Sequence, residues 1–327
     1  KNENRFLGLN SNSYRLKTGI LKMFNFLEKK AKEPVIKVLA RERTQYNDIY
    51  VIQNGDYREL WFKGNGDYFL QSRVNTEQQK QLALVYSNMM MASLLFCPKP
   101  RRLLMIGLGG AAVTNFLSEQ FPSLHIDVVD IDPKVIEVSK KYFYLRESNR
   151  YRIFEEDGRV FIQNRKGQEP YDWIILDAFK SGSIPYHLKT CEFYKEIRFI
   201  LKSDGIVGSN LYGKGNSLKP RDTKTFMSVF PNIYCFEDAE RVATVLIANG
   251  GERWSEEKIH ESAKIFNEIS EPFLMKEVAK TYRPGKFFNE SAAKFDDHFS
   301  EKGFLHDVEK ENRSSTKPRQ YPIKNIH

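Results

Sequence analysis

Three glycines and an aspartate mark the points in the middle of the chain where two apolar runs end. Gly107, Gly109 and Gly110 follow the apolar run 103–106, and Asp130 ends the next run about twenty residues later. Glycines let the backbone approach a ligand closely, and a carboxylate at the following strand end can accept hydrogen bonds from both hydroxyls of a ribose. The spacing therefore predicts a binding site for a nucleoside cofactor.

Two more aspartates follow the next two predicted strands. Asp157 lies in EEDGR directly before Gly158, and Asp177 follows the apolar residues 173–176. Each aspartate alone would fit a helix cap or a turn, but the set at successive strand ends favours a ligand-binding edge. Asp157 can accept a hydrogen bond from an adenine amino group, and a desolvated Asp177 can hold or deprotonate an amine. The loop 178–185 is predicted to close over this site.

Alternating strands and helices must position these residues, and the hydrophobic pattern from residue 103 onward predicts them. Strands are predicted at 103–107, 126–130, 151–155, 172–177, 205–211, 232–237 and 242–248. Helices are predicted at 112–120, 133–143, 158–164, 190–201 and 221–229. Because the links between them are short, we expect a parallel sheet covered on both faces, which is a doubly wound, Rossmann-like α/β fold.

The two ends of the chain have different patterns. Short, partly alternating apolar segments separated by Asn-Gly and Gly-Asn-Gly turns precede the α/β pattern and predict β-hairpins. Helical periodicity with a candidate N-cap at Ser255 follows it. The predicted organisation is a basic N-terminal extension (1–34), a β-hairpin domain (35–75), a Rossmann-like donor-binding domain (76–250), a C-terminal helical extension (251–307) and a disordered tail (308–327).

The charge and composition restrict where the protein acts and what it contacts. The net charge is +9, and residues 1–43 hold eleven Lys or Arg against four acids. This basic arm predicts a weak contact with nucleic acid or an anionic surface, unless it is only a solvated extension. A mean hydropathy of −0.54 and the lack of a long apolar run argue against a membrane span. Three distant cysteines and no signal-peptide pattern predict a cytoplasmic protein without a metal site.

Three segments of the chain carry a family resemblance. They are IDVVDIDPKVIEVSKKYF (126–143), EDGRVF (156–161) and DAFKSGSIPYHLKTCEFY (177–194). Together they resemble the polyamine aminopropyltransferase (spermidine synthase) family, and most closely its spermidine synthase-like branch with a class I methyltransferase-type fold. The resemblance extends over roughly residues 36–250. It implies an S-adenosyl donor, an amine-type acceptor and a homodimer.

The resemblance also implies roles for individual residues. Asp130 would contact the ribose, Asp157 with Gly158 the adenine, Asp177 the reacting amine, and Gln71 the donor. Gly107, Gly109 and Gly110 would form the turn that surrounds the donor. Apart from the resemblance, Tyr186 and Tyr212 are predicted to flank the acceptor pocket, although aromatic residues at such positions more often pack in the core or at the rim. His187 is predicted either to gate the substrate or to lie at the surface.

Departures from the family pattern bear on the reaction. Aminopropyltransferases carry GGGDG in the turn, and its aspartate holds the aminopropyl amine of the donor; here Gly110 stands in its place. The YHE-like motif that contacts the polyamine reads Tyr86-Ser87-Asn88, and Asn47 replaces a glutamine in the first hairpin. Gly110 removes a carboxylate that would repel the carboxylate of S-adenosylmethionine, and it is expected to open room there.

These departures favour methyl transfer, or another reaction of full S-adenosylmethionine, in which Asp177 acts as the catalytic acid–base group. Two alternatives remain open. One is an aminopropyltransferase that uses decarboxylated S-adenosylmethionine and takes the missing anion from another residue. The other is a non-catalytic protein that binds a nucleoside or nucleic acid.

Overall fold

The computed structural model describes residues 36–64, 67–79, 81–180, 182–211, 218–240, 243–269, 275–285, 291–298 and 300–314. The predicted basic extension 1–34 and Tyr212 lie outside these residues. None of the helices in the described ranges is long and apolar enough to cross a membrane.

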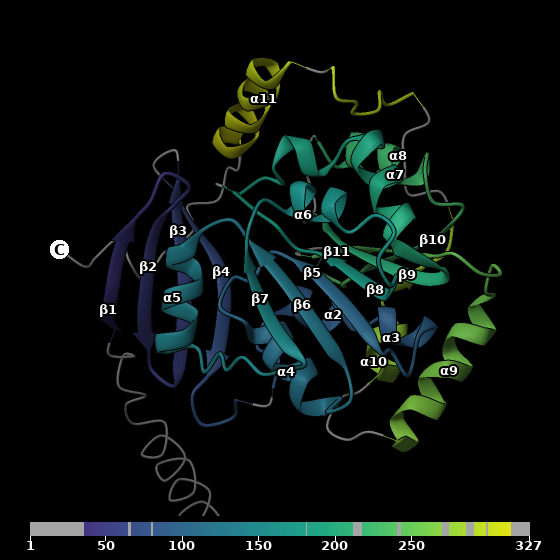
Figure 1. Cartoon of the computed structure of the whole chain (residues 1–327), viewed down its shortest axis with the longest axis horizontal. Coiled ribbons are helices and arrows are strands. Elements are labelled where there is room, and N and C mark those ends of the chain that lie inside the picture. The colour runs from purple at the N-terminus through teal and green to yellow at the C-terminus, as the bar shows by residue number, and fades with distance from the viewer. Residues whose placement is uncertain are drawn as a thin grey trace, which may run out of the picture.

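A four-stranded antiparallel sheet precedes the α/β part of the chain (Figure 1). Its strands are β1 (Ile36–Arg43), β2 (Asp48–Asn54), β3 (Tyr57–Gly64) and β4 (Asp67–Asn75), paired in chain order. The predicted hairpins are therefore present. Two short helices, α2 (Val85–Met90) and α3 (Ser93–Phe96), then lead into the larger sheet.

The larger sheet has eight strands in the order β12-β10-β11-β9-β8-β5-β6-β7. Five of them are parallel to one another: β5 (Arg102–Ile106), β6 (His125–Asp130), β7 (Tyr151–Glu155), β8 (Tyr171–Leu176) and β9 (Leu201–Leu211). The chain order reverses beside β5, which places the ligand-binding edge at the carboxyl ends of β5, β6 and β8.

The prediction of a parallel sheet is wrong at the other edge. Strands β10 (Asn232–Glu237) and β11 (Thr244–Asn249) form an antiparallel hairpin, and β11 pairs antiparallel with β9. The link between β10 and β11 is too short for a helical crossover, so the chain must reverse direction there. The C-terminal extension adds the edge strand β12 (Tyr282–Arg283), so this extension is not only helical.

Helices cover both faces of the sheet, as predicted. Alternate residues of β5 point to opposite faces of the sheet. Leu103 and Met105 belong to the apolar cluster on one face, and Leu104 and Ile106 belong to the cluster on the other. The first cluster includes residues of α2, α3, α4 (Ala112–Gln120), α5 (Pro133–Tyr142), α9 (Glu256–Ile269) and α10 (Met275–Ala279). The second includes residues of α6 (Gly158–Asn164), α7 (Cys191–Ile200), α8 (Lys219–Met227) and α11 (Glu301–Ser314). The short 3-10 helix η1 (Tyr186–Leu188) lies beside α6 and α7.

The last helix corrects the predicted disordered tail. Helix α11 continues through residues 308–314, so disorder from residue 308 is wrong for this part. Phe304 and Val308 are buried against the second apolar cluster, and this burial stabilises a helix whose sequence is mostly polar. Residues beyond 314 lie outside the described part of the chain.

Candidate functional site

The glycine turn after β5 is in direct contact with the end of β8. Gly107 has φ +96°, and its N–H donates to the carbonyl of Val129 at 2.8 Å. A Cβ atom at this position would lie 2.5 Å from the carbonyl oxygen of Asp177. Only glycine combines this φ with this close approach. The turn and Asp177 are therefore held next to each other by backbone contact.

The next glycines pack against strand β4 of the smaller sheet. The N–H of Gly110 donates to Ser72 Oγ at 2.7 Å, and Gly109 has φ +52°. A Cβ at Gly110 would lie 2.8 Å from Ser72 Cβ and 3.0 Å from the ring of Phe143. The expectation that Gly110 opens room is therefore wrong, because Ser72 and Phe143 already fill the space that a side chain would need.

Asp130 supports the same turn from the end of β6. Its carboxylate accepts hydrogen bonds from the backbone N–H groups of Leu108, at 2.9 Å, and Asp132, at 3.0 Å. Burial raises the pKa of Asp130 to about 6, although these hydrogen bonds act in the opposite direction. Asp130 thus lies at the predicted edge, directly against the glycine turn. Its contact with a ribose stays a prediction.

Asp177 lies at the carboxyl end of β8 between two polar residues. The side-chain amide of Asn210 donates to its carboxylate at 2.8 Å, and the Tyr86 hydroxyl forms a second hydrogen bond with it. Burial raises the pKa of Asp177 to about 7, and burial together with Asp177 raises the pKa of Tyr86 well above its usual value. A carboxyl with this pKa can exchange a proton near neutral pH.

Tyr86 also connects Asp177 to Gln71. The backbone carbonyl of Gln71 lies 3.0 Å from the Tyr86 hydroxyl oxygen and is an alternative acceptor for its single hydrogen, and Gln71 directly precedes Ser72, which contacts the glycine turn. The structure therefore brings Gln71, Asp130, Asp177 and the glycines together. Sequence reasoning did not assign Tyr86 or Asn210 to this site, although Tyr86 stands at the tyrosine of the YHE-like motif.

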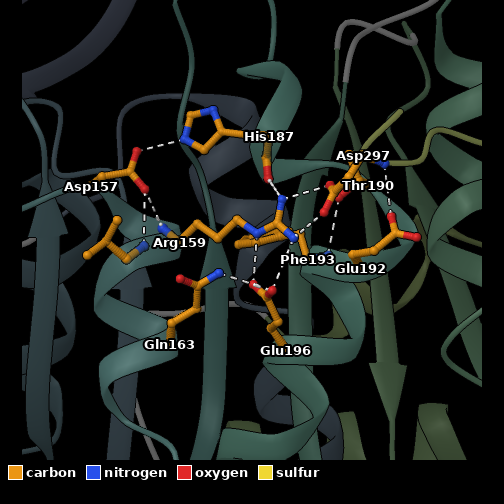
Figure 2. A network of polar contacts seen from close by, with 10 residues as sticks. Asp157, Arg159, Gln163, His187, Thr190, Glu192, Phe193, Glu196 and Asp297 are labelled. Carbon is orange, nitrogen blue, oxygen red and sulfur yellow. Dashed lines mark hydrogen bonds and ion pairs between the residues drawn. The ribbon is translucent and has the colours of Figure 1, made fainter. Parts of the chain in front are cut away.

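Asp157 caps helix α6 and contacts His187 of η1, directly after the predicted lid loop (Figure 2). Its Oδ1 accepts hydrogen bonds from the N–H groups of Arg159, at 2.9 Å, and Val160, at 3.1 Å, and its Oδ2 lies 2.7 Å from His187 Nε2. Burial acts to raise the pKa of Asp157, but His187 and the helix N–H groups together hold it below its usual value. An adenine contact of Asp157 stays a prediction. It would have to share this carboxylate with the helix and with His187.

Gly158 has a packing role. A Cβ at this position would lie 2.6 Å from Cγ2 of Ile106, so a glycine allows α6 to approach β5 closely. Tyr186 also packs, because its ring contacts Phe295 and Phe304 of the C-terminal extension. His187, which was also expected around the acceptor, contacts Asp157 at the N-terminus of α6.

The positions that hold a polyamine in aminopropyltransferases make internal contacts here. The Asn88 amide donates to the carbonyls of Leu82 and Leu84 at the start of its own helix. Asn47 donates to the buried Asp132 carboxylate at 3.1 Å, which ties the β1–β2 turn to the N-terminus of α5. These side chains therefore stabilise the fold.

Comparison with known proteins gives four findings. The spermine/spermidine synthase domain family matches residues 83–212. The chain is 37% identical to the polyamine aminopropyltransferase of Vibrio vulnificus (strain CMCP6) over 203 residues, which are 61% of this chain and 67% of that protein. It is 28% identical to the eEF1A lysine and N-terminal methyltransferase of Xenopus laevis over 211 residues, 59% of this chain and 30% of that protein. A solved spermidine synthase in complex with the transition state analogue AdoDATO shares the fold, with a TM-score of 0.60 and 19% identity over 75% of this chain and 84% of that one.

Proposed function

Because the chain belongs to the spermidine synthase-like family of transferases that use S-adenosyl donors, we propose that it transfers a methyl group from S-adenosylmethionine to an amine-type acceptor. The observation that carries this proposal is the packing at Gly110. In aminopropyltransferases the residue at this position is the aspartate that holds the donor's amine. Here Ser72 and Phe143 fill the space beside the backbone. The turn therefore offers no carboxylate at this position to attract an ammonium or to repel the carboxylate of the full donor.

The residues at this edge fit an S-adenosyl donor. The glycines of the turn carry no side chains, so a donor can contact the backbone of the turn directly. Asp130 lies against the turn at the end of the second parallel strand. A bound donor supplies an electrophilic carbon on its sulfonium. The acceptor nitrogen forms its bond to this carbon as the carbon–sulfur bond breaks, and Asp177 accepts the proton that the nitrogen loses. Tyr86 and Asn210 hold the Asp177 carboxylate in position for this step.

The same geometry argues against a free diamine as the acceptor. Asn47 and Asn88 stand at positions used for polyamines in the family. Here their side-chain amides donate hydrogen bonds to the Asp132 carboxylate and to the Leu82 carbonyl, respectively. Tyr86 alone of this group remains beside Asp177. The proposed acceptor is therefore an amine that Tyr86 and Asp177 recognise at the reacting nitrogen and that needs no second ammonium site at Asn88.

Aminopropyl transfer is the second candidate. It is favoured by the 37% identity to the aminopropyltransferase of Vibrio vulnificus, which exceeds the 28% identity to the methyltransferase. Asp130 and Asp177 are carboxylates at the same edge, and either one could take over the attraction of the aminopropyl ammonium. The two candidates differ in the donor, so donor affinity separates them.

Calorimetric titration of the full chain with S-adenosylmethionine and with its decarboxylated form tests the proposal. We expect S-adenosylmethionine to bind at least about tenfold more tightly, a difference of about 1.4 kcal/mol, because the turn lacks the repelling carboxylate. Tighter binding of the decarboxylated donor would support aminopropyl transfer and reject methyl transfer. S-adenosylhomocysteine serves as the product control, because both reactions share its adenosyl group but only methyl transfer releases it.

Asp130→Ala should weaken the binding of S-adenosylhomocysteine about 100-fold, because it removes the predicted ribose contact and the hydrogen bond that holds Leu108 of the glycine turn. Glu155→Ala is the matched control, since Glu155 pairs with Asp130 in register on the neighbouring strand and is exposed. Affinity is measured by calorimetry and folding by thermal melting. Unchanged affinity in Asp130→Ala would contradict the ribose assignment.

A further inference from the structure

We propose that Arg159 is a positioning residue that, together with the C-terminal segment, holds the lid against the donor edge. We call residues Tyr186–Thr190 the lid base and residues Phe295–Asp297 the clasp. The consequence for donor binding rests on the proposed function, whereas the effect on the mobility of the lid does not. The contacts that support this role come from helices α6 and α7, the lid base and the clasp, as Figure 2 shows.

Arg159 forms paired contacts with two carboxylates. Its Nη1 and Nη2 donate to Asp297 at 2.8 and 2.7 Å, and its Nε and Nη2 donate to Glu196 on α7 at 2.8 and 3.1 Å. Its Nη1 also lies 3.5 Å from the carbonyl oxygen of His187. Only 13% of the Arg159 side chain is exposed. A planar guanidinium can serve both carboxylates at once, which a lysine ammonium cannot do with the same geometry.

The first turn of α6 therefore contacts the lid base twice. Asp157 lies 2.7 Å from the imidazole of His187, and Arg159, two residues later, contacts the main chain of the same residue. Asp157 is also the residue predicted to meet the adenine. Any change that releases Arg159 should let His187 move away from Asp157 and loosen this end of the site.

The clasp is fixed to the body of the protein by its own contacts. The carbonyl of Phe295 accepts a hydrogen bond from the N–H of Cys191, its N–H donates to Thr225 Oγ1, and both distances are 2.9 Å. The N–H of Asp297 donates to Glu192 at 3.1 Å. Phe295 itself is fully buried. These contacts hold the clasp independently of Arg159, so the Arg159–Asp297 ion pair links α6 to a segment that is itself fixed to the body of the protein.

The clasp also covers a buried charge at the lid base. The ammonium of Lys189 lies 2.8 Å from Asp222, and both side chains are fully buried. The same ammonium lies 4.6 Å from the ring centre of Phe295 and 4.8 Å from that of Phe304. Tyr186 packs on the same two rings and donates its hydroxyl hydrogen to the Asp296 carbonyl. A lid base that moved away from the clasp would expose this ion pair and lose these aromatic contacts, so the two segments should move together.

Asp297→Asn in the full chain tests the inference with two measurements. Hydrogen exchange should become faster in peptides that contain the lid base and Cys191, and the Kd for S-adenosylhomocysteine should rise about tenfold. Exchange in peptides from β5 and β6 should not change. Glu277→Gln is the matched control, because it removes an exposed ion pair with Lys280 at 2.6 Å on α10, away from the lid.

A double-mutant cycle separates positioning from general stability. If Arg159 acts through the lid, Arg159→Lys should weaken donor binding about tenfold in the wild-type background and by less than about twofold when His187→Ala is already present. Equal effects in both backgrounds, or unchanged exchange at the lid base in Asp297→Asn, would overturn the inference. Faster exchange with an unchanged Kd would also overturn it. If the wild-type chain binds no S-adenosyl nucleoside, the proposed function is rejected. The exchange measurement alone would then test whether Arg159 and the clasp hold the lid base in place.

Discussion

Asp177→Asn is expected to lower kcat about 1000-fold while changing the Kd for S-adenosylhomocysteine by less than about twofold. The carboxylate accepts the acceptor's proton in the proposed reaction, and an amide cannot. The product lacks the reacting amine, so its affinity should not depend on Asp177. Steady-state kinetics and calorimetry on the same preparations check this prediction, and an unchanged kcat would remove Asp177 from the mechanism.

The pH profile provides a second test of the same residue. Burial raises the pKa of Asp177 to about 7, and only its ionised form can accept a proton. The wild-type kcat/KM should therefore fall as the pH drops below about 7. In Asp177→Asn the residual activity should lose this dependence and follow only the ionisation of the acceptor. An acid limb that stays at the same pH in the variant would assign it to another group.

The raised pKa also predicts a change in stability. Because the folded state holds the proton more tightly than the unfolded chain, the contribution of Asp177 is fully present below pH 4 and is lost as the pH rises through about 7. At pH 8 the buried carboxylate destabilises the fold, so Asp177→Asn should raise the free energy of unfolding by about 1–3 kcal/mol.

Asp172, at the start of the same strand, is the matched control for this stability change. Burial acts to raise the pKa of Asp172, but Lys202 and the backbone N–H groups of Arg101 and Arg102 hold it below its usual value. Asp172→Asn should therefore lower stability at pH 8. Denaturant unfolding at pH 5 and pH 8 measures both variants, and a loss of stability at pH 8 in Asp177→Asn would contradict the assigned pKa shift.

Local sequence patterns were sufficient to predict the order of strands and helices between residues 103 and 249. Glycine and aspartate at strand ends interrupt the apolar periodicity there, and each of the predicted elements needs only its own residues to be recognised. At the sheet edge formed by β10 and β11, both strands were predicted but their antiparallel direction was not. This direction depends on the length of the link between the two strands. The helix at 308–314 was missed because its support comes from burial of Phe304 and Val308 against distant residues.

The site shows the same division between local and distant information. Asp130, Asp157 and Asp177 could be placed at one edge because each ends or follows a strand. The partners of these residues could not be predicted, because Ser72 meets Gly110 from another sheet and Asn210 reaches Asp177 from another strand. The clasp lies still further away, because Arg159 and Asp297 are 138 positions apart in the sequence. Such pairs follow from tertiary packing and leave no short-range pattern.

Gly107→Ala is expected to destabilise the protein by at least about 3 kcal/mol and to abolish donor binding. The φ of +96° is strained for alanine, and the new Cβ would lie 2.5 Å from the carbonyl oxygen of Asp177, which is backbone and cannot rotate away. The end of β8 would have to shift, and this movement would carry Asp177 away from Tyr86 and Asn210. Denaturant unfolding and calorimetry measure the two effects.

Gly167→Ala separates the strain at φ from the collision with Asp177. Gly167 also has a positive φ, +81°, but a Cβ there would meet nothing within 4 Å. Alanine at Gly167 should therefore cost only about 1 kcal/mol, with donor binding unchanged. If Gly107→Ala costs no more than Gly167→Ala, the turn can move away from β8. The close approach of Gly107 would then not be what holds Asp177 beside the donor.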